Sequence, residues 1–527
     1  MKEYLKALDT RLSSSTFVSN ADTLKRNQRP GSSFFTEINA GLTTFFTMAY
    51  IIAVNASIVA DSGGTCVNPE DKLRYDSCLV GVKRDLVTAT AAIAGIGSVA
   101  FGFFTNLPVA IAPGMGLNAY FTYQVVGYHG SGSISYQLAL TSVFMEGFIF
   151  LFLSLIGMRQ WLVKIIPGSI KVASGVGIGL FLTEIGLSAA GIGMISGARD
   201  SPTDLAGCPS KYINEHTGAC VSHKMTSPTM WIGILCGGVP TAWLMRNTSF
   251  TYFPNTPDGH HMHEFFTKVV SFHPIQNSLA VLDWNISAAG GHFALALFTF
   301  LYVDIIDSTA TLYSMARFSG VTDPDTGDFP RSTLAYCCDA ITISIGALLG
   351  CSPATAFIES GAGITDGGRT GLTAMTTGVC FLISIFFAPI FASIPPWATG
   401  CTLVLVGCMM MRQVTAVNWS FIGDALPAFI TIAAMPLTYS VAYGLIAGIF
   451  SYSILNGLIA VTRKLSGGRI QPPDADNAEY WTYKPSDEHP PWFIRATKGQ
   501  LWRSNHSVAE IQGGDQCAER KLDYSGD

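Results

Sequence analysis

The chain has 527 residues, of which 49% are hydrophobic and only 13% are charged. Soluble globular proteins carry about 25% charged residues. Together with a mean hydropathy of +0.36, this composition predicts a membrane protein that crosses the bilayer several times. It excludes a soluble enzyme, a secreted disulfide scaffold and a disordered protein. The formal net charge of −5 comes without a basic block, so nothing indicates a nucleic-acid partner.

Apolar stretches long enough to cross a bilayer follow a polar N-terminal segment. The residues up to Thr36 are polar, so we expect no cleavable signal peptide, and the first span should act as the targeting signal. Windows of about 19 residues predict spans near 38–60, 86–106, 137–157, 163–192, 228–246, 291–316, 333–350, 371–392, 395–411, 421–440 and 441–461. A polar tail follows from Thr462.

Lys and Arg residues beside the spans predict the orientation of the chain. The N-terminal segment and the start of the tail are basic, and the positive-inside rule then puts both termini in the cytoplasm. The loops 61–85 and 193–227 are expected to face outside, and each holds two cysteines that would form a disulfide or stay as thiols. These pairs are Cys66 with Cys78 and Cys208 with Cys220.

Two apolar segments, 107–125 and 351–365, are interrupted by Pro, Gly and polar residues. Each is the third hydrophobic element of its half of the chain. Interrupted segments at matching positions indicate an inverted-repeat transporter with its site at the repeat interface. Unwound backbone survives inside a bilayer only where it is buried in protein or lines a cavity. The alternative is a pair of kinked or re-entrant packing helices.

Five stretches of the chain resemble the AzgA-like purine permeases, which are related to the nucleobase–ascorbate transporters and uracil permeases. They are AGLTTFFTMAYIIAVN (40–55), APGMGLNAYFTY (112–123), LYVDIIDSTATLYSMARFSG (301–320), ATAFIESGAGITDGGRTGLTA (354–374) and PAFITIAAMPLTYSVAYG (427–444). The resemblance extends over roughly residues 30–490.

The resemblance implies an all-α polytopic fold of two inverted sets of seven spans. A core domain of spans 1–4 and 8–11 moves, in an elevator-like way, against a gate domain of spans 5–7 and 12–14. Spans 3 and 10 are short strand-plus-helix elements. The resemblance also implies a multi-pass protein of the plasma membrane that takes up adenine, guanine and hypoxanthine with protons, and analogy with this fold suggests a homodimer.

The chain departs from this plan near its middle. The expected segments are a cytoplasmic N-terminus (1–37), the first core-domain segment (38–157), the first gate-domain segment with a loop (158–290), the second core-domain segment (291–392), the second gate-domain segment (393–461) and a cytoplasmic tail (462–527). After Arg246 the chain passes directly into the polar stretch 247–274, so the seventh span is predicted to be missing. Thirteen alternating spans would put Asn285 in the cytoplasm, whereas a seventh crossing would put it outside.

Acidic residues within spans are costly, and they are therefore candidates for function. Asp304 lies in the eighth family span and Glu359 in the broken tenth. The resemblance assigns both to substrate binding, since a carboxylate accepts hydrogen bonds from the ring N–H groups of a purine. Either one is also a candidate for proton coupling. The alternative for both is that they cap broken helices or pair with Ser and Thr.

Neighbouring residues complete the predicted site. Asn118 offers an amide donor and acceptor, and Ser308 lies one turn from Asp304 on the same helical face. Phe357 would present its ring to a flat purine or pack in the core. Asp307 would line the site or hold the two broken segments together. Gly116 and Thr355, one in each broken segment, are predicted to support the site.

The polar residues outside the predicted site give weaker evidence of function. Glu146 and Glu184, in the fourth and fifth spans, are expected at tolerant interface positions. The tract His260-His261-Met262-His263 lies in a polar loop and is expected to be solvated, so we predict neither a metal nor a cofactor. Rival functions are a permease for another planar heterocycle such as uracil, xanthine or urate, an anion carrier, and a remnant that no longer transports. The acidic site disfavours an anion.

Overall fold

The computed structural model describes residues 33–66, 72–157, 167–187, 270–286, 290–321, 329–392, 396–411, 414–415, 417–438 and 441–466. Seven helices among them are long and apolar enough to cross a membrane, and two shorter apolar helices accompany them. They confirm the spans predicted at these positions. The span predicted near 228–246, the gap expected at span 7 and the pair Cys208–Cys220 lie outside the described residues.

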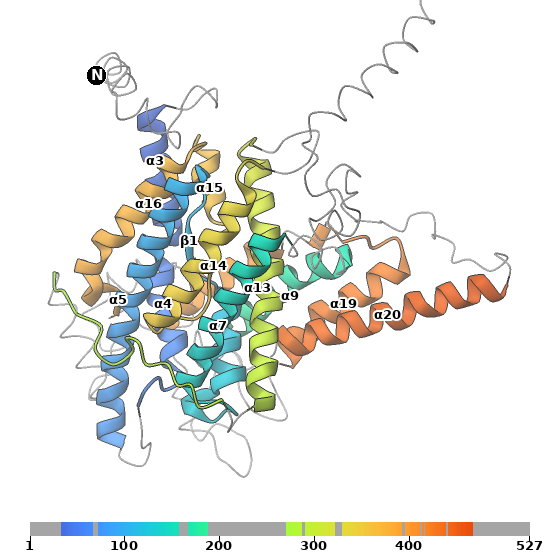
Figure 1. Cartoon of the computed structure of the whole chain (residues 1–527), viewed down its shortest axis with the longest axis horizontal. Helices are drawn as coiled ribbons and strands as arrows, with labels where there is room; N and C mark the ends of the chain where they lie inside the picture. The colour runs from blue at the N-terminus through green and yellow to red at the C-terminus, as the bar shows by residue number, and fades with distance from the viewer. Residues whose placement is uncertain are drawn as a thin grey trace, which may run out of the picture.

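The helices follow the apolar runs because a helix satisfies its backbone groups within one segment, which the hydrocarbon layer demands. In the labels of Figure 1 they are α3 (Phe34–Met48), α4 (Tyr50–Ala60), α5 (Lys72–Thr105), α7 (Tyr136–Ile156), α9 (Gly168–Leu187), α13 (Gly290–Phe318), α14 (Ser332–Leu348), α16 (Gly371–Ser384), α17 (Ala388–Ala392), α18 (Pro396–Met411), α19 (Ile422–Leu437) and α20 (Val441–Leu465).

The two interrupted segments have the predicted strand-plus-helix form. The first is β1 (Ile111–Pro113), α6 (Met115–Ala119) and a π-helix (Tyr120–Val126), and the second is β2 (Ala354–Ala356) followed by α15 (Ser360–Thr365). The strands pair antiparallel, with Ala112 opposite Thr355. The two broken segments thus meet through their backbones at the centre of the bundle.

Serine hydroxyls satisfy backbone groups that the short strands leave open. The Ser98 Oγ accepts a hydrogen bond from the Ile111 amide (2.9 Å), and the Ser360 Oγ accepts one from the Ala110 amide (3.0 Å). The aromatic rings of Tyr120 and Phe300 pack edge to face, with centroids 5.1 Å apart. These contacts fix the first broken segment against α5, α15 and α13.

The remaining helices form two groups around this centre. Helices α4, α5, α13 and α14 contact the strand pair, and α3, α7 and α16 pack against this set, while α9 packs against α18 and α19, and α19 against α20. Figure 1 shows α19 and α20 extending side by side away from the first group. The assignment of these groups to a moving core domain and a gate domain stays a prediction.

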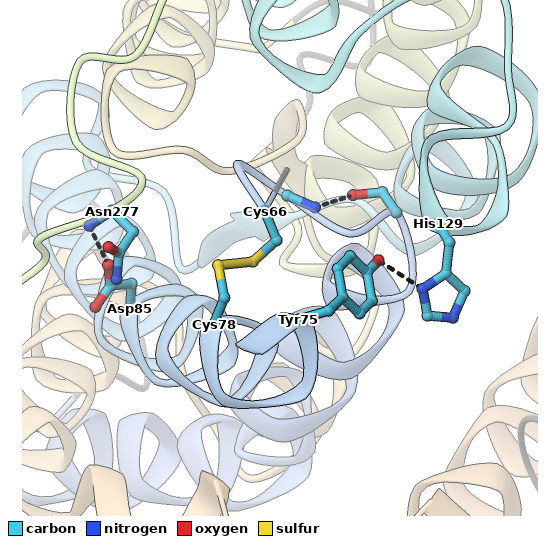
Figure 2. Close-up of a disulfide and its surroundings, with 8 residues drawn as sticks. Cys66, Tyr75, Cys78, Asp85, His129 and Asn277 are labelled. Atoms are coloured by element: carbon cyan, nitrogen blue, oxygen red, sulfur yellow. Dashed lines mark hydrogen bonds between the residues drawn. A yellow bond between two sulfur atoms is a disulfide. The ribbon is translucent and has the colours of Figure 1, made fainter. Parts of the chain in front are cut away.

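The disulfide expected as one possibility between Cys66 and Cys78 is present, and Figure 2 shows it beside the Tyr75–His129 hydrogen bond. Residues 270–286 lie at the same end of the bundle. The Asp85 carboxylate, in α5, accepts hydrogen bonds from the amides of Gln276 and Asn277 (3.0 and 2.5 Å). The loop before α13 is therefore on the side of the disulfide, opposite the start of α3 (Figure 1). This disagrees with thirteen alternating spans, which would place Asn285 on the other side.

Candidate functional site

A cavity of about 90 Å³ lies where the two broken segments meet α13 and α9. Its walls include Gly116 from the first broken segment, Thr355, Phe357 and Glu359 from the second, and Asp307 from α13. The structure thus brings together these five predicted residues. Gly116 allows the close approach of the two helical groups, since a Cβ there would lie 2.6 Å from the Ile178 side chain of α9.

Glu359 is held by a residue that the sequence analysis missed. It stands directly before α15, and its side chain is buried. The Tyr50 hydroxyl, in α4, donates a 2.7 Å hydrogen bond to its Oε1. This contact fixes the orientation of the carboxyl group at the cavity wall, because a hydroxyl donor aims at one lone pair. Phe357 is also buried, and its amide donates to the Ala110 carbonyl (3.0 Å), which extends the strand pairing.

Asp304 and Ser308 are fully buried and are not among the residues that line the cavity. They belong to a network behind Thr355. The Ser308 Oγ lies 2.9 Å from the Thr355 Oγ1, 2.5 Å from the Asp339 Oδ2 and 3.5 Å from the Asp304 Oδ1. A chain of hydroxyl and carboxyl oxygens therefore runs from the cavity wall into the core of the first helical group.

A third acid joins this network. Glu146 is fully buried and close enough to Asp304 and Asp339 to interact electrostatically with both. Neither of its carboxyl oxygens has a hydrogen-bond partner among the described residues. The structure places the Glu146 side chain inside the first helical group, where α7 turns it toward Asp304 of α13 and Asp339 of α14, and its tolerance to substitution stays a prediction. Asp339 was missed although it is an acid within an apolar run, which is the signal that singled out Asp304.

Asn118 is also buried outside the cavity lining. Its Oδ1 accepts a hydrogen bond from the Ser352 hydroxyl, so its amide links the first broken segment to the residue two positions before β2. Its Nδ2 has no partner within the described chain. This arrangement makes Asn118 a link between the broken segments in the conformation seen here, and its contact with substrate stays a prediction.

Lys171 of α9 also lines the cavity, and the sequence analysis did not single it out. Lys171 lies within the predicted span 163–192. A charged residue inside a span is a candidate for function, but only the acids were treated in this way. Among the described residues, no carboxylate oxygen lies within 4 Å of its ammonium group. The cavity therefore has carboxyl groups and a cationic group on different elements.

Comparison with known proteins gives a family and relatives. The sequence matches the permease family Xan_ur_permease over residues 35–446. It is 55% identical to an efflux pump of Aspergillus versicolor, over 92% of this chain and 90% of that protein. It is 54% identical to a putative xanthine/uracil permease of Schizosaccharomyces pombe, over 90% and 80%. Bacterial relatives are a guanine/hypoxanthine permease of Bacillus subtilis (35%, over 80% and 90%) and an adenine permease of Escherichia coli (34%, over 81% and 88%).

A solved structure supports the fold alone. The transmembrane domain of a cyanobacterial bicarbonate transporter matches with a TM-score of 0.51 and 17% identity, over 81% of this chain and 98% of that domain. The predicted fold class, an all-α polytopic transporter with interrupted spans, is confirmed. The relatives are transporters and not enzymes, as the sequence predicted.

Proposed function

Because the chain belongs to the permease family Xan_ur_permease, we propose that it carries purine nucleobases across the plasma membrane. The observation that carries this proposal is the cavity between the broken segments, where Asp307, Glu359 and Phe357 share one wall region. Carboxylates accept hydrogen bonds from ring N–H groups, and an aromatic ring next to them suits a flat heterocycle. The two bacterial purine permeases support the same substrate class.

Accumulation of a neutral purine needs a driving ion, and we propose that this ion is a proton held at Glu359 or Asp304. A protonated carboxyl group both donates and accepts hydrogen bonds, whereas a carboxylate only accepts. The oxygen chain through Thr355 and Ser308 connects the cavity wall with Asp304. The first helical group would carry substrate and proton past α9 and α18–α20 in an elevator-like movement.

A permease for another planar heterocycle is the second candidate, since one fungal relative is a putative xanthine/uracil permease. The direction of transport is open to test as well, because another fungal relative is an efflux pump. Both points are settled by one set of substrates. Labelled adenine, hypoxanthine, xanthine and uracil, offered outside or preloaded inside, distinguish the ring class and the direction.

The first experiment measures uptake by the full chain in a cell that lacks its own purine transporters. Asp304→Ala and Glu359→Ala should each abolish uptake while the protein remains at the cell surface. Loss of a buried hydrogen-bond partner costs about 1–3 kcal/mol, which corresponds to a loss of roughly tenfold to hundredfold in affinity. Near-normal uptake by Glu359→Ala would exclude Glu359 from the site, and near-normal uptake by Asp304→Ala would exclude a role for Asp304 behind the cavity wall. Absence of uptake by the unaltered chain at the surface removes the proposed function and leaves the non-transporting remnant.

A further inference from the structure

The cavity holds one basic side chain that the proposed function does not use. Lys171 lies in the first turn of α9, within the second group of helices, whereas Asp307 and Glu359 belong to α13 and to the second broken segment. All three line the same cavity. The lysine therefore lines the cavity from a different structural unit than the acids.

The contacts of Lys171 within the described chain involve its backbone and give its side chain no structural role. Its backbone N–H donates to the Pro167 carbonyl (3.2 Å), and its carbonyl accepts from the Ser174 hydroxyl (2.8 Å). Within the described chain, its ammonium makes neither a hydrogen bond nor an ion pair. A partly buried cation without a partner is destabilising. A group that enters the cavity would supply the missing acceptor.

The chemistry of the two walls selects the kind of ring that fits between them. A lysine ammonium has three donors and no acceptor, so it pairs only with an acceptor such as a carbonyl oxygen. The acids that line the same cavity accept hydrogen bonds from ring N–H groups. A 6-oxopurine presents a carbonyl oxygen next to a ring N–H, which matches one group on each wall. Adenine carries an exocyclic amino group at that position, and its donors would meet the donors of the ammonium.

We propose that Lys171 donates a hydrogen bond to a carbonyl oxygen of the substrate and thereby makes the carrier selective for oxopurines over adenine. This inference rests on the proposed function and narrows it to guanine, hypoxanthine and similar oxo-substituted rings. A site built to hydrogen-bond a substrate group rejects an analogue that lacks the group, because the buried partner is then left unpaired.

The test is competition for uptake of labelled hypoxanthine in the transporter-null cell, with surface levels measured by labelling. In the unaltered chain, hypoxanthine and guanine should inhibit at concentrations at least tenfold lower than adenine or unsubstituted purine, about the effect of one charge-assisted hydrogen bond. Lys171→Met should raise the inhibitory concentrations of hypoxanthine and guanine about tenfold to hundredfold. Those of adenine and unsubstituted purine should stay within about twofold, because neither ring offers the carbonyl oxygen.

Two variants serve as controls. Lys464→Met removes a lysine from the exposed end of α20 and should leave every inhibitory concentration unchanged. Lys171→Arg keeps the cation and should keep the preference for oxopurines. If Lys171→Met does not reach the cell surface, the preference of Lys171→Arg for oxopurines over adenine still tests the inference.

Three results would overturn the inference without touching the proposed function. They are tighter inhibition of the unaltered chain by adenine, an equal loss for all purines in Lys171→Met, and no change in that variant. If the unaltered chain at the cell surface takes up no purine at all, the proposed function itself fails.

Discussion

Ser308 has one hydroxyl hydrogen and three oxygen neighbours. Only one neighbour can accept that hydrogen, and the Asp339 Oδ2 at 2.5 Å is the closest. Thr355, at 2.9 Å, then donates its own hydrogen to the Ser308 Oγ. The Asp304 Oδ1, at 3.5 Å, is the most distant of the three and the weaker alternative acceptor for the same hydrogen. The hydroxyl thus orders the hydrogens of a network that begins at the cavity wall.

Removal of this hydroxyl tests the network. Ser308→Ala leaves the Asp339 and Thr355 oxygens with one partner fewer in a buried site, which costs about 1–3 kcal/mol. We expect a lower melting temperature of the purified protein and a loss of uptake of roughly tenfold. Ser308→Thr keeps the hydroxyl and should retain most of both. Equal uptake by the alanine variant and the unaltered protein would contradict a role for the network in transport.

At the scale of elements, a small group of hydrogen bonds holds the end of the first broken segment that lies nearest the disulfide. The Tyr123 hydroxyl, in the π-helix, donates to the Asp61 Oδ2 (2.8 Å), and the His129 amide donates to the Asp61 carbonyl (2.8 Å). Figure 2 shows Tyr75 pointing its hydroxyl at the His129 ring, next to the Cys66–Cys78 disulfide. Asp61, just past the end of α4, therefore ties the segment that lines the cavity to the disulfide loop.

Asp61 should make this group of hydrogen bonds sensitive to pH. Burial raises the pKa of the Asp61 carboxyl from 3.8 to about 6, against the lowering effects of the Tyr123 hydrogen bond and the Lys83 charge. A raised pKa of an acid means that the folded state binds the proton more tightly. The resulting stabilisation is complete below pH 3.8 and is lost as the pH rises through about 6.

The measurement is the melting temperature of the purified protein below and above the pKa of Asp61. We expect the unaltered chain to lose stability as the pH rises through about 6, and Asp61→Asn to show a flatter dependence because its amide does not titrate. Cys408→Ser, on the exposed face of α18, should keep the unaltered dependence. Parallel curves for Asp61→Asn and the unaltered chain would exclude Asp61 as the titrating group.

Much of the arrangement of elements could be predicted from the sequence, because Pro, Gly and polar residues together interrupt an apolar run at matching places in the two halves. Pro113 and Pro353 lack an N–H donor, which favours a break in the helix there, although α19 continues through Pro427 and Pro436. The positions of side chains around α13 could not be predicted. Asp304 and Asp307 are three residues apart, yet only Asp307 reaches the cavity, because α7 and α14 cover Asp304. Lys171 was missed because the argument about charged groups inside spans was applied to acids alone, and its place at the cavity depends on how α9 packs.

At the scale of the whole molecule, the position of the loop 270–286 fixes how the two halves are oriented. Besides its bonds to Asp85, its Ala280 amide donates to the Leu348 carbonyl at the end of α14 (2.7 Å). The Asp283 carbonyl accepts from the Thr141 hydroxyl near the start of α7 (2.6 Å). The loop therefore lies at the end of the bundle that is predicted to face outside, and α13 runs from it toward the predicted cytoplasmic end. The connection after α13 is flanked in the sequence by Arg317 and Arg331, which the positive-inside rule also places in the cytoplasm.

Labelling of a single introduced cysteine checks this orientation. Asn285 is exposed, and Asn285→Cys should react with an impermeant maleimide on intact cells, above the background of the unaltered chain. Ser466→Cys, after the basic end of α20, should react only once the cells are permeabilised. Labelling of Asn285→Cys only after permeabilisation would restore the arrangement of thirteen alternating spans.

Coupling to protons involves the whole molecule, because it links a site in one helical group to a movement past the other. If the proton sits on Glu359, its release inside leaves an acceptor-only carboxylate beside the Tyr50 hydroxyl, and a substrate acceptor loses its donor. Uptake should then fall as the external pH rises and collapse with a protonophore.

Glu359→Gln keeps the shape of the side chain and stays neutral at every pH. This variant should exchange labelled for unlabelled purine across the membrane but fail to accumulate it. Protonophore-sensitive accumulation at the unaltered level in Glu359→Gln would move the proton to Asp304 and its neighbours Glu146 and Asp339. Sodium-dependent uptake would exclude proton coupling, since a carboxyl cluster that serves a metal ion must give up its protons to bind it.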